Sequence, residues 1–420
     1  MTSGTPGVIA SRHPYVVAGI GFLVAMVDGY DTLMLAFIAP LISKEWALHP
    51  QTVGAIFASS YAGAALGATA IGIAADRFGR KTMLLASLAL VAVFTMLCAR
   101  SASPAQLMVL RALAGLGLGG ALSTSIALIA ENAAAHQRRA IVTRMFLGFP
   151  IGAIVGGAVT AGVMSSLGWR GVFLAGGVCA LLLIPLVALG VTESAGGPHA
   201  ASRIHSRRPL TELVSEGRAR ITALYCVSVF LMLLTSYFLV SWIPTVLTLN
   251  GMSAQHAAMG AVIINVGGIV GTLILSFIIG RRSPLAPVVV CLCSGAILIA
   301  LLGHGIVWPG NEKFLLVFAV GLAVIGAQGC IPALGVHLYP ASVYATAGGL
   351  SVACGRLGSI IGPLVGGYLV SARLGWSRLF LLAAVPAMSA AIAMAALALT
   401  RQRDANADEL PGQRGTESSG

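Results

Sequence analysis

The sequence predicts an all-α membrane protein with twelve membrane-spanning helices in two six-helix halves. Its residues are 57% hydrophobic and only 9% charged, and the mean hydropathy is +0.93, whereas a soluble domain carries about 25% charged residues. The apolar residues occur in blocks of about 20 or more, the length that crosses a hydrocarbon core of about 30 Å. The abundance of glycine, 52 residues, suits close helix packing in lipid.

Apolar blocks and the polar breaks between them place the spans in order. The expected ranges are 15–41, 51–75, 82–100, 104–130, 140–166, 170–191, 221–249, 254–279, 285–305, 314–338, 346–371 and 376–400.

The basic residues predict that both termini are cytoplasmic. Segments on one side of the predicted spans carry 17 of the 25 Lys and Arg residues, segments on the other side carry six, and Arg111 and Arg356 lie inside spans. Cytoplasmic loops of membrane proteins are enriched in Lys and Arg, so the richer side is the cytoplasmic one. Because these residues lie in short loops, the net charge of +12 indicates membrane topology, and we expect no nucleic-acid partner.

The longest internal polar stretch, Thr192 to Arg220, predicts the domain organisation. It is rich in Arg, Ser, Gly and Pro, as a linker is. The expected parts are an N-terminal half at 1–191, a cytoplasmic linker at 192–220, a C-terminal half at 221–400 and a polar tail at 401–420. Residues 167–174 (LGWRGVFL) resemble residues 374–381 (LGWSRLFL), which supports a repeat of half the chain with the same topology in each half.

Four ionisable side chains fall inside the predicted spans: Asp28, Asp31, Arg111 and Arg356. A charge at the middle of the bilayer costs at least about 2.5–3.5 kcal/mol, so these residues need a reason to be there. One explanation is that they neutralise each other in structural pairs. The other is a proton and substrate site in a wet central cavity.

Depth along the helices favours a common site. Asp31 lies about 4.5 Å further out than Asp28 at 1.5 Å per residue, and their spacing puts both carboxylates on one helix face. Arg111 should lie near the level of Asp31, and Arg356 near the midplane. Two carboxylates in a poorly solvated place cannot both ionise at low cost, so one is expected to exchange a proton. An arginine keeps its charge and suits an anionic substrate.

The segment 72–81 (GIAADRFGRK) joins the second and third predicted spans. It resembles the signature loop of the major facilitator superfamily, and residues 111–120 (RALAGLGLGG) resemble the fourth-span motif of the same superfamily. The resemblance covers essentially the whole chain and implies the major facilitator fold. It also implies a cytoplasmic gate, in which Asp76 pairs with Arg144 or its neighbours and Glu131 is a third member. The expected gate residues are Gly72, Asp76, Arg77, Gly79, Arg80, Glu131 and Arg144.

Residues 28–32 (DGYDT), 37–40 (FIAP) and 355–367 (GRLGSIIGPLVGG) resemble elements of the aromatic acid:proton symporters. By that resemblance, the residues needed for uptake are Asp28, Asp31, Arg111 and Arg356. The chain departs from the pattern at 280–284, where the loop lacks the acidic residue of a second gate. It departs again at 344–347, where the family usually has an Arg and a Gly.

Polar and aromatic residues inside other spans are candidates for the substrate cavity. Tyr61, Asn265, Gln328 and His337 could touch substrate, or they could only bond to a neighbouring helix, a contact of about 0.6 kcal/mol. Trp242 and Phe238 could stack on an aromatic ring or pack as ordinary apolar residues.

The interpretation that unites these observations is a secondary transporter of a bacterial cytoplasmic (inner) membrane. It would import an aromatic carboxylate of the benzoate, hydroxybenzoate or phenylpropionate type by proton symport with alternating access. The partners are the small carboxylate, protons and the lipid bilayer, and we expect a monomer that is not an enzyme. The seven cysteines lie in apolar segments without zinc spacing, so we expect neither metal nor cofactor beside the coupling proton.

Two alternatives stay open. The first is a drug or other organic-anion proton antiporter of the same superfamily, although the Gly-Pro-x-x-Gly-Gly motif of many exporters occurs here at 362–367 rather than in the fifth span. The second is a transporter-like receptor, for which the polar tail of about 20 residues is too short to form an output domain.

Overall fold

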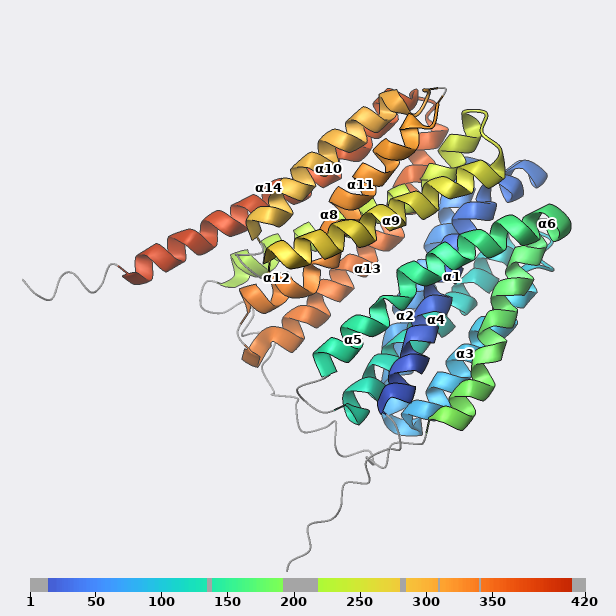
Figure 1. Ribbon diagram of the computed structural model, residues 1–420, viewed down its shortest axis with the longest axis horizontal. Coiled ribbons are helices and arrows are strands. Elements are labelled where there is room, and N and C mark those ends of the chain that lie inside the picture. The colour runs from blue at the N-terminus through green and yellow to red at the C-terminus, as the bar shows by residue number, and fades with distance from the viewer. Residues whose placement is uncertain are drawn as a thin grey trace, which may run out of the picture. The chain divides into compact units, whose positions relative to one another are not determined.

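The computed structural model describes residues 14–133, 138–191, 218–279, 285–308, 310–339 and 341–409. The predicted linker (apart from residues 218–220), the loop at 280–284 and the last part of the tail lie outside these ranges. Helices make up most of the described residues, which include no strand (Figure 1). Their bounds are α1 (Pro14–Glu45), α2 (Pro50–Phe78), α3 (Arg80–Cys98), α4 (Pro104–Asn132), α5 (Arg138–Phe146), α6 (Gly148–Gly190), α8 (Arg218–Leu249), α9 (Ala254–Ile279), α10 (Leu285–Gly305), α11 (Glu312–Gly329), α12 (Ile331–Leu338), α13 (Ala341–Ser371) and α14 (Trp376–Glu409).

Twelve segments of the described chain are long and apolar enough to cross a membrane, which confirms the predicted all-α multi-pass protein. The ranges predicted at 254–279 and 285–305 coincide with α9 and α10. The fifth and sixth spans run together as α6, in which Gly168 interrupts the helix at φ 63° and ψ −163°. A side chain would strain a residue in that left-handed region, so glycine suits the turn between the two spans.

The span predicted at 314–338 is wrong as a single helix. The structure has α11 up to Gly329, a turn at Cys330, and then the short helix α12. Pro332 lies in the first turn of α12, and a proline cannot donate a backbone hydrogen bond to the preceding turn. The helix therefore restarts here, with proline in the first turn, where its missing donor costs least.

The chain divides into two compact units: the first contains α1 to α6 and the start of α9 up to Met259, and the second contains α8, the rest of α9 and α10 to α14. In the first, α2 packs on α4 and α1 on α6 (Figure 1). Glycines bring both helix pairs into backbone contact, because a Cβ at these positions would collide with a carbonyl group of the opposite helix. In the α2–α4 contact the pairs are Gly63 with Ala112, Gly67 with Leu116, Gly115 with Ser60 and Gly119 with Ala64. In the α1–α6 contact they are Gly29 with Phe149, Gly148 with Phe22 and Gly152 with Met26.

The second unit uses the same device at corresponding helices. Gly358 and Gly362 of α13 meet the carbonyl groups of Phe230 and Leu234 on α8. In the α9–α11 contact the pairs are Gly267 with Phe318, Gly271 with Leu322 and Gly321 with Ile264. The contact of Gly148 with Phe22 thus corresponds to the contact of Gly358 with Phe230. The same glycine contact occurs in both units, as expected for an internal repeat.

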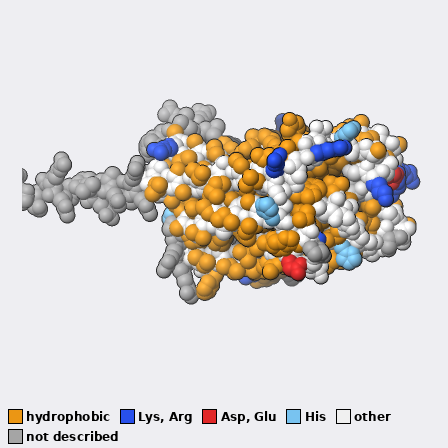
Figure 2. All heavy atoms as spheres, turned by 90° about the horizontal axis from the view of Figure 1, so that it is seen from above, with side chains coloured by type: hydrophobic (Ala, Val, Ile, Leu, Met, Phe, Trp, Pro, Cys, Tyr) orange, Lys and Arg blue, Asp and Glu red, His pale blue; other side chains and the backbone are white. Residues whose placement is uncertain are grey.

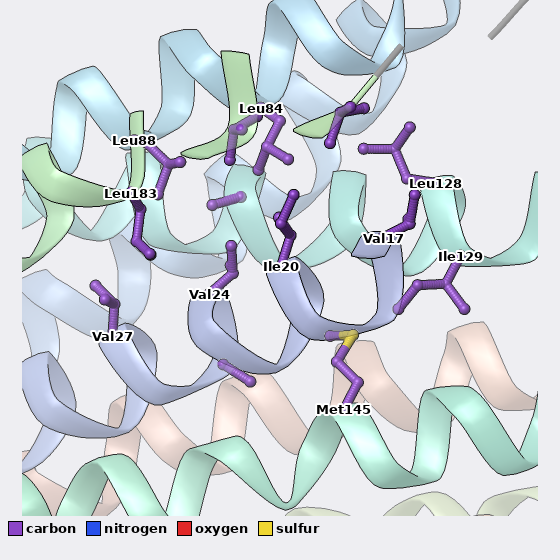
Figure 3. Close-up of a cluster of buried hydrophobic side chains, with 14 of the residues drawn as sticks. Val17, Ile20, Val24, Val27, Leu84, Leu88, Leu128, Ile129, Met145 and Leu183 are labelled. Atoms are coloured by element: carbon purple, nitrogen blue, oxygen red, sulfur yellow. The ribbon is translucent and has the colours of Figure 1, made fainter. Parts of the chain in front are cut away.

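Apolar side chains fill the core of the first unit. One face of α1 contributes Val17, Ile20, Val24 and Val27 at helical spacing. Figure 3 shows these side chains in a cluster of buried hydrophobic residues. Leu84 and Leu88 of α3, Leu128 of α4 and Leu183 of α6 join the same cluster. Hydrophobic side chains also cover most of the surface seen in Figure 2, as expected for helices that face lipid.

Candidate functional site

Asp31 of α1 and Arg111 of α4 form a bidentate ion pair inside the first unit. Arg111 Nη1 donates to Asp31 Oδ1 at 2.9 Å, and Arg111 Nη2 donates to Asp31 Oδ2 at 2.6 Å. The two parallel hydrogen bonds match the planar guanidinium to the carboxylate. The structure therefore brings together two of the four charged residues that the sequence singled out, at the common depth that helix geometry predicted.

Side chains from two further helices form hydrogen bonds with this ion pair. Arg111 Nε donates to Ser60 Oγ of α2 at 2.8 Å, and Thr95 Oγ1 of α3 donates to Asp31 Oδ1 at 3.3 Å. The guanidinium also lies 5.9 Å from the ring centroid of Phe173 on α6. Sequence reasoning missed Ser60, Thr95 and Phe173. The available signal was weak, because hydroxyl side chains inside helices commonly bond to their own backbone.

The pair is sealed from solvent. Asp31 is 2% exposed and Arg111 is 1% exposed, whereas the sequence predicted that both line a wet cavity. The expectation of a wet cavity is not met at these two residues, since the partners of both charges are protein groups. Asp28 is half-buried on the same helix, one turn from Asp31. Tyr61, a predicted cavity residue, is also buried in this unit.

The second unit holds the fourth charged residue, Arg356 of α13, which is half-buried. From Arg218 to Arg403 the sequence contains a single acidic residue, Glu312. The described part of the chain contains no ion pair of Arg356. Arg356 is therefore a positive charge within a membrane span. The spans of its unit contain one carboxylate, that of Glu312 at the start of α11.

The remaining predicted cavity residues lie on three helices of the second unit. Asn265 of α9 is buried, and its side-chain amide donates to Ala261 of the same helix at 2.7 Å. Gln328 is half-buried at the end of α11, and His337 is exposed at the end of α12. Arg401 of α14 donates to the backbone oxygen of His337 at 2.5 Å. Tyr61 lies in the first unit, and the other three candidates lie in the second.

Trp242 of α8 is a packing residue in this structure. It is 1% exposed, and its indole nitrogen donates to the carbonyl group of Pro363 on α13 at 3.0 Å. Phe238, one turn earlier on the same helix, is buried as well. Both aromatic residues contribute to the α8–α13 contact.

The turn between α2 and α3 carries a separate polar cluster. Gly79 adopts φ 92° there, which favours glycine. Arg80 Nη2 pairs with Asp76 Oδ1 at 2.5 Å, and Arg80 Nε pairs with Glu131 Oε1 of α4 at 3.1 Å. Glu131 is thus a member of the cluster, as expected.

The expected pair between Asp76 and Arg144 is absent among the described residues. Arg80 lies four residues after Asp76 on adjoining helix ends and occupies that carboxylate instead. Arg144 is exposed on α5. Gly72 is half-buried and Arg77 is exposed on α2, in the last turns before this cluster.

No three His, Cys, Asp or Glu side chains within the described ranges lie together as metal ligands do. The site consists of paired and unpaired charges within membrane spans. Such residues mark ion and substrate pathways in membrane proteins.

A family model described as the Major Facilitator Superfamily matches residues 21–361. The chain belongs to this superfamily. Among its relatives, the gallate transporter of Pseudomonas putida is 31% identical, with 96% of this chain and 95% of the relative covered. The 3-(3-hydroxy-phenyl)propionate transporter of Escherichia coli K12 is 34% identical, with 88% and 90% covered. The 4-hydroxybenzoate transporter PcaK of Acinetobacter baylyi is 29% identical, with 94% and 93% covered.

Solved structures agree with the superfamily fold. A D-xylose-proton symporter superposes with a TM-score of 0.73 at 19% identity, covering 90% of this chain and 97% of the other. A bacterial homolog of the human lysosomal transporter Spinster superposes with a TM-score of 0.74 at 17% identity, covering 94% and 98%. The family and the relatives are transporters, so this superfamily member is a membrane transporter rather than an enzyme, as the sequence predicted.

Proposed function

We propose that this transporter imports aromatic carboxylates together with protons across the bacterial cytoplasmic membrane. The observation that carries the proposal is the buried Asp31–Arg111 pair within membrane spans. Relatives named for gallate, 4-hydroxybenzoate and 3-(3-hydroxy-phenyl)propionate transport support the substrate class. All three of these compounds carry a carboxylate on an aromatic framework.

Asp31 is the proposed proton-coupling residue. Asp28, one turn away, is the proposed second carboxylate that exchanges the proton. In the closed pair, Asp31 is an anion balanced by Arg111. A proton on Asp31 would remove that balance, and Arg111 would keep its positive charge because a guanidinium does not lose its proton in proteins. The protonated state would therefore favour the arrival of an anion, which links proton binding to substrate binding.

Charge balance gives a reason for symport. An anion that enters against a negative-inside potential costs about 2.3 kcal/mol per 100 mV. One proton carried with each carboxylate cancels that charge, so the proton gradient can then drive uptake. Release of both ligands in the cytoplasm would restore the Asp31–Arg111 pair.

Arg356 is the proposed residue that holds the substrate carboxylate. It is half-buried in a membrane span, and the described residues give it no ion pair. Arginine binds a carboxylate through two parallel hydrogen bonds, which would orient the aromatic ring as well as attract its charge.

We further infer that the end of the first unit with Gly79 faces the cytoplasm, in agreement with the distribution of basic residues. The Asp76–Arg80–Glu131 cluster at this end would then act as the cytoplasmic gate. Its ion pairs are partly exposed, and exposed pairs contribute only about 0–1 kcal/mol. They can therefore break in each transport cycle at low cost.

The decisive experiment is uptake of labelled aromatic acids into proteoliposomes, with and without an inward proton gradient. We expect uptake that rises with the gradient and stops when a protonophore collapses it. Uptake that persists after collapse would contradict symport, and acid-driven efflux would favour the antiporter alternative. The variant Asp28→Asn/Asp31→Asn should bind but not accumulate substrate, and unimpaired accumulation would exclude these residues from coupling.

A further inference from the structure

Lys313 of α11 is a buried cation in a unit whose membrane spans are nearly free of acids. The residue is only 8% exposed. It shares one face of α11 with Val317, Val320 and Val324, which are all fully buried at helical spacing. Lysine is seldom buried to this degree, so its charge has to be met by solvent or by an anion.

The described chain supplies no such anion. Lys313 is absent from the ion pairs of the described residues, and it has no side-chain hydrogen bond there. The neighbouring Glu312 is exposed, and adjacent residues on a helix point in different directions. The ammonium group is not among the buried polar atoms that lack a partner, so it retains contact with solvent although its stem is buried.

The internal repeat shows that the second unit has no counterpart of the buried Asp31–Arg111 pair. Gly115 on α4 and Gly321 on α11 occupy equivalent packing positions. The same alignment places Val317 at the position of Arg111, and Lys313 lies one turn before Val317. In the first unit, the facing helix supplies Asp31. The repeat of 208 residues between Phe22 and Phe230 assigns Leu239 to the equivalent position on α8.

We propose that Lys313 is a carboxylate-binding residue at the outer end of α11, which the substrate meets before it reaches Arg356. The proposal rests on the proposed function for its substrate class and its orientation. A lysine ammonium is a compact charge on a flexible stem, and it attracts a carboxylate without fixing its direction. Arg356, with its planar group, would then orient the ligand.

The lysine content makes a direct test possible. The sequence contains only three lysines, Lys44, Lys81 and Lys313. Lys44 is exposed at the end of α1 and serves as the control. Proteoliposomes would be treated with a membrane-impermeant amine-acylating reagent, with and without benzoate, and labelling of each lysine would be measured by mass spectrometry. We expect benzoate to protect Lys313 and to leave Lys44 unchanged.

Uptake kinetics give the second readout. Lys313→Met keeps an apolar stem and removes the charge. We expect its KM for the aromatic acid to rise about ten-fold with little change in kcat, since the variant loses a hydrogen bond between charged groups. Lys313→Arg should retain most of the affinity, and Lys44→Met should behave like the wild type. A role in folding alone would change the amount of inserted protein and not the KM.

Three outcomes would overturn the proposal. One is an unchanged KM in Lys313→Met, and another is equal labelling of Lys313 with and without benzoate. The third is protection of Lys313 by lipid alone, with labelling restored in detergent, which would identify a phospholipid headgroup as the anion. The labelling experiment does not require transport. A wild-type protein that fails to transport aromatic acids would therefore refute the proposed function separately.

Discussion

Arg111 of α4 donates two hydrogen bonds, of 2.9 and 2.6 Å, to Asp31 of α1. Ser60 accepts a further hydrogen bond from Arg111, and Thr95 donates one to Asp31. The pair connects four helices of the first unit at one buried point. It therefore serves the packing of the unit in this state, and any step that separates the two charges has to provide a new partner for each.

The first prediction concerns the stability of this pair. Asp31→Asn should destabilise the protein by about 3–5 kcal/mol, because it leaves the charge of Arg111 buried without compensation. Replacement of both residues in Asp31→Leu/Arg111→Met should restore most of the loss, because two apolar side chains need no partner. Thermal unfolding in detergent measures both effects, and equal losses in the single and double variants would argue against a coupled pair.

The second prediction separates Arg356 from Arg111. Since Arg356 has no ion pair among the described residues, Arg356→Gln should insert and unfold like the wild type but lose affinity for aromatic acids. Arg356→Lys should recover only part of that affinity, because an ammonium group lacks the two-pronged geometry of a guanidinium. Binding to purified protein by calorimetry tests this, and wild-type affinity in Arg356→Gln would remove the residue from the substrate site.

The third prediction concerns the α2–α3 turn cluster. Glu131→Gln and Arg80→Gln should change stability by less than about 1 kcal/mol, since these pairs are partly exposed, yet both should slow transport if the cluster is a gate. Arg144→Gln is the matched control, because Arg144 is exposed and has no ion pair in the described structure. A larger effect of Arg144→Gln than of Arg80→Gln would show that Arg144 is the functional partner of Asp76.

The fourth prediction concerns helix packing. Gly29→Ala should destabilise the first unit by about 1–3 kcal/mol, because the new Cβ would collide with the backbone carbonyl group of Phe149 on α6. Gly19→Ala on the same helix is the control, since its Cβ would meet no atom within 4 Å. The control should be neutral or slightly stabilising. Equal unfolding temperatures for the two variants would contradict the close α1–α6 contact.

The sequence predicted most of the fold because lipid imposes a simple length rule on apolar segments. The spans at 254–279 and 285–305 have sharp polar borders and were correct to the residue. The span at 314–338 failed because a hydropathy pattern does not register a helix break inside an apolar run. Pro332 was the visible signal, since proline favours the first turn of a new helix.

The candidate site was only partly predictable. The common depth of Asp31 and Arg111 follows from a fixed rise per residue, so their meeting could be foreseen. The hydroxyl groups of Ser60 and Thr95 could not, because nothing in their spacing distinguishes a bond to another helix from one to their own backbone. The Asp76–Arg80 pair depends on the turn at Gly79, which brings the end of α2 and the start of α3 together, whereas the family resemblance pointed to Arg144.

The matching glycine contacts in the two units have an evolutionary consequence. A gene duplication that copied one six-helix ancestor would pass on the backbone-to-backbone contacts unchanged, because almost no side chain fits where Gly148 meets Phe22 or where Gly358 meets Phe230. Positions that face away from these contacts would be free to diverge. One descendant has a carboxylate at Asp31, and the other has Leu239 at the equivalent place, so a single scaffold acquired two electrically different interiors.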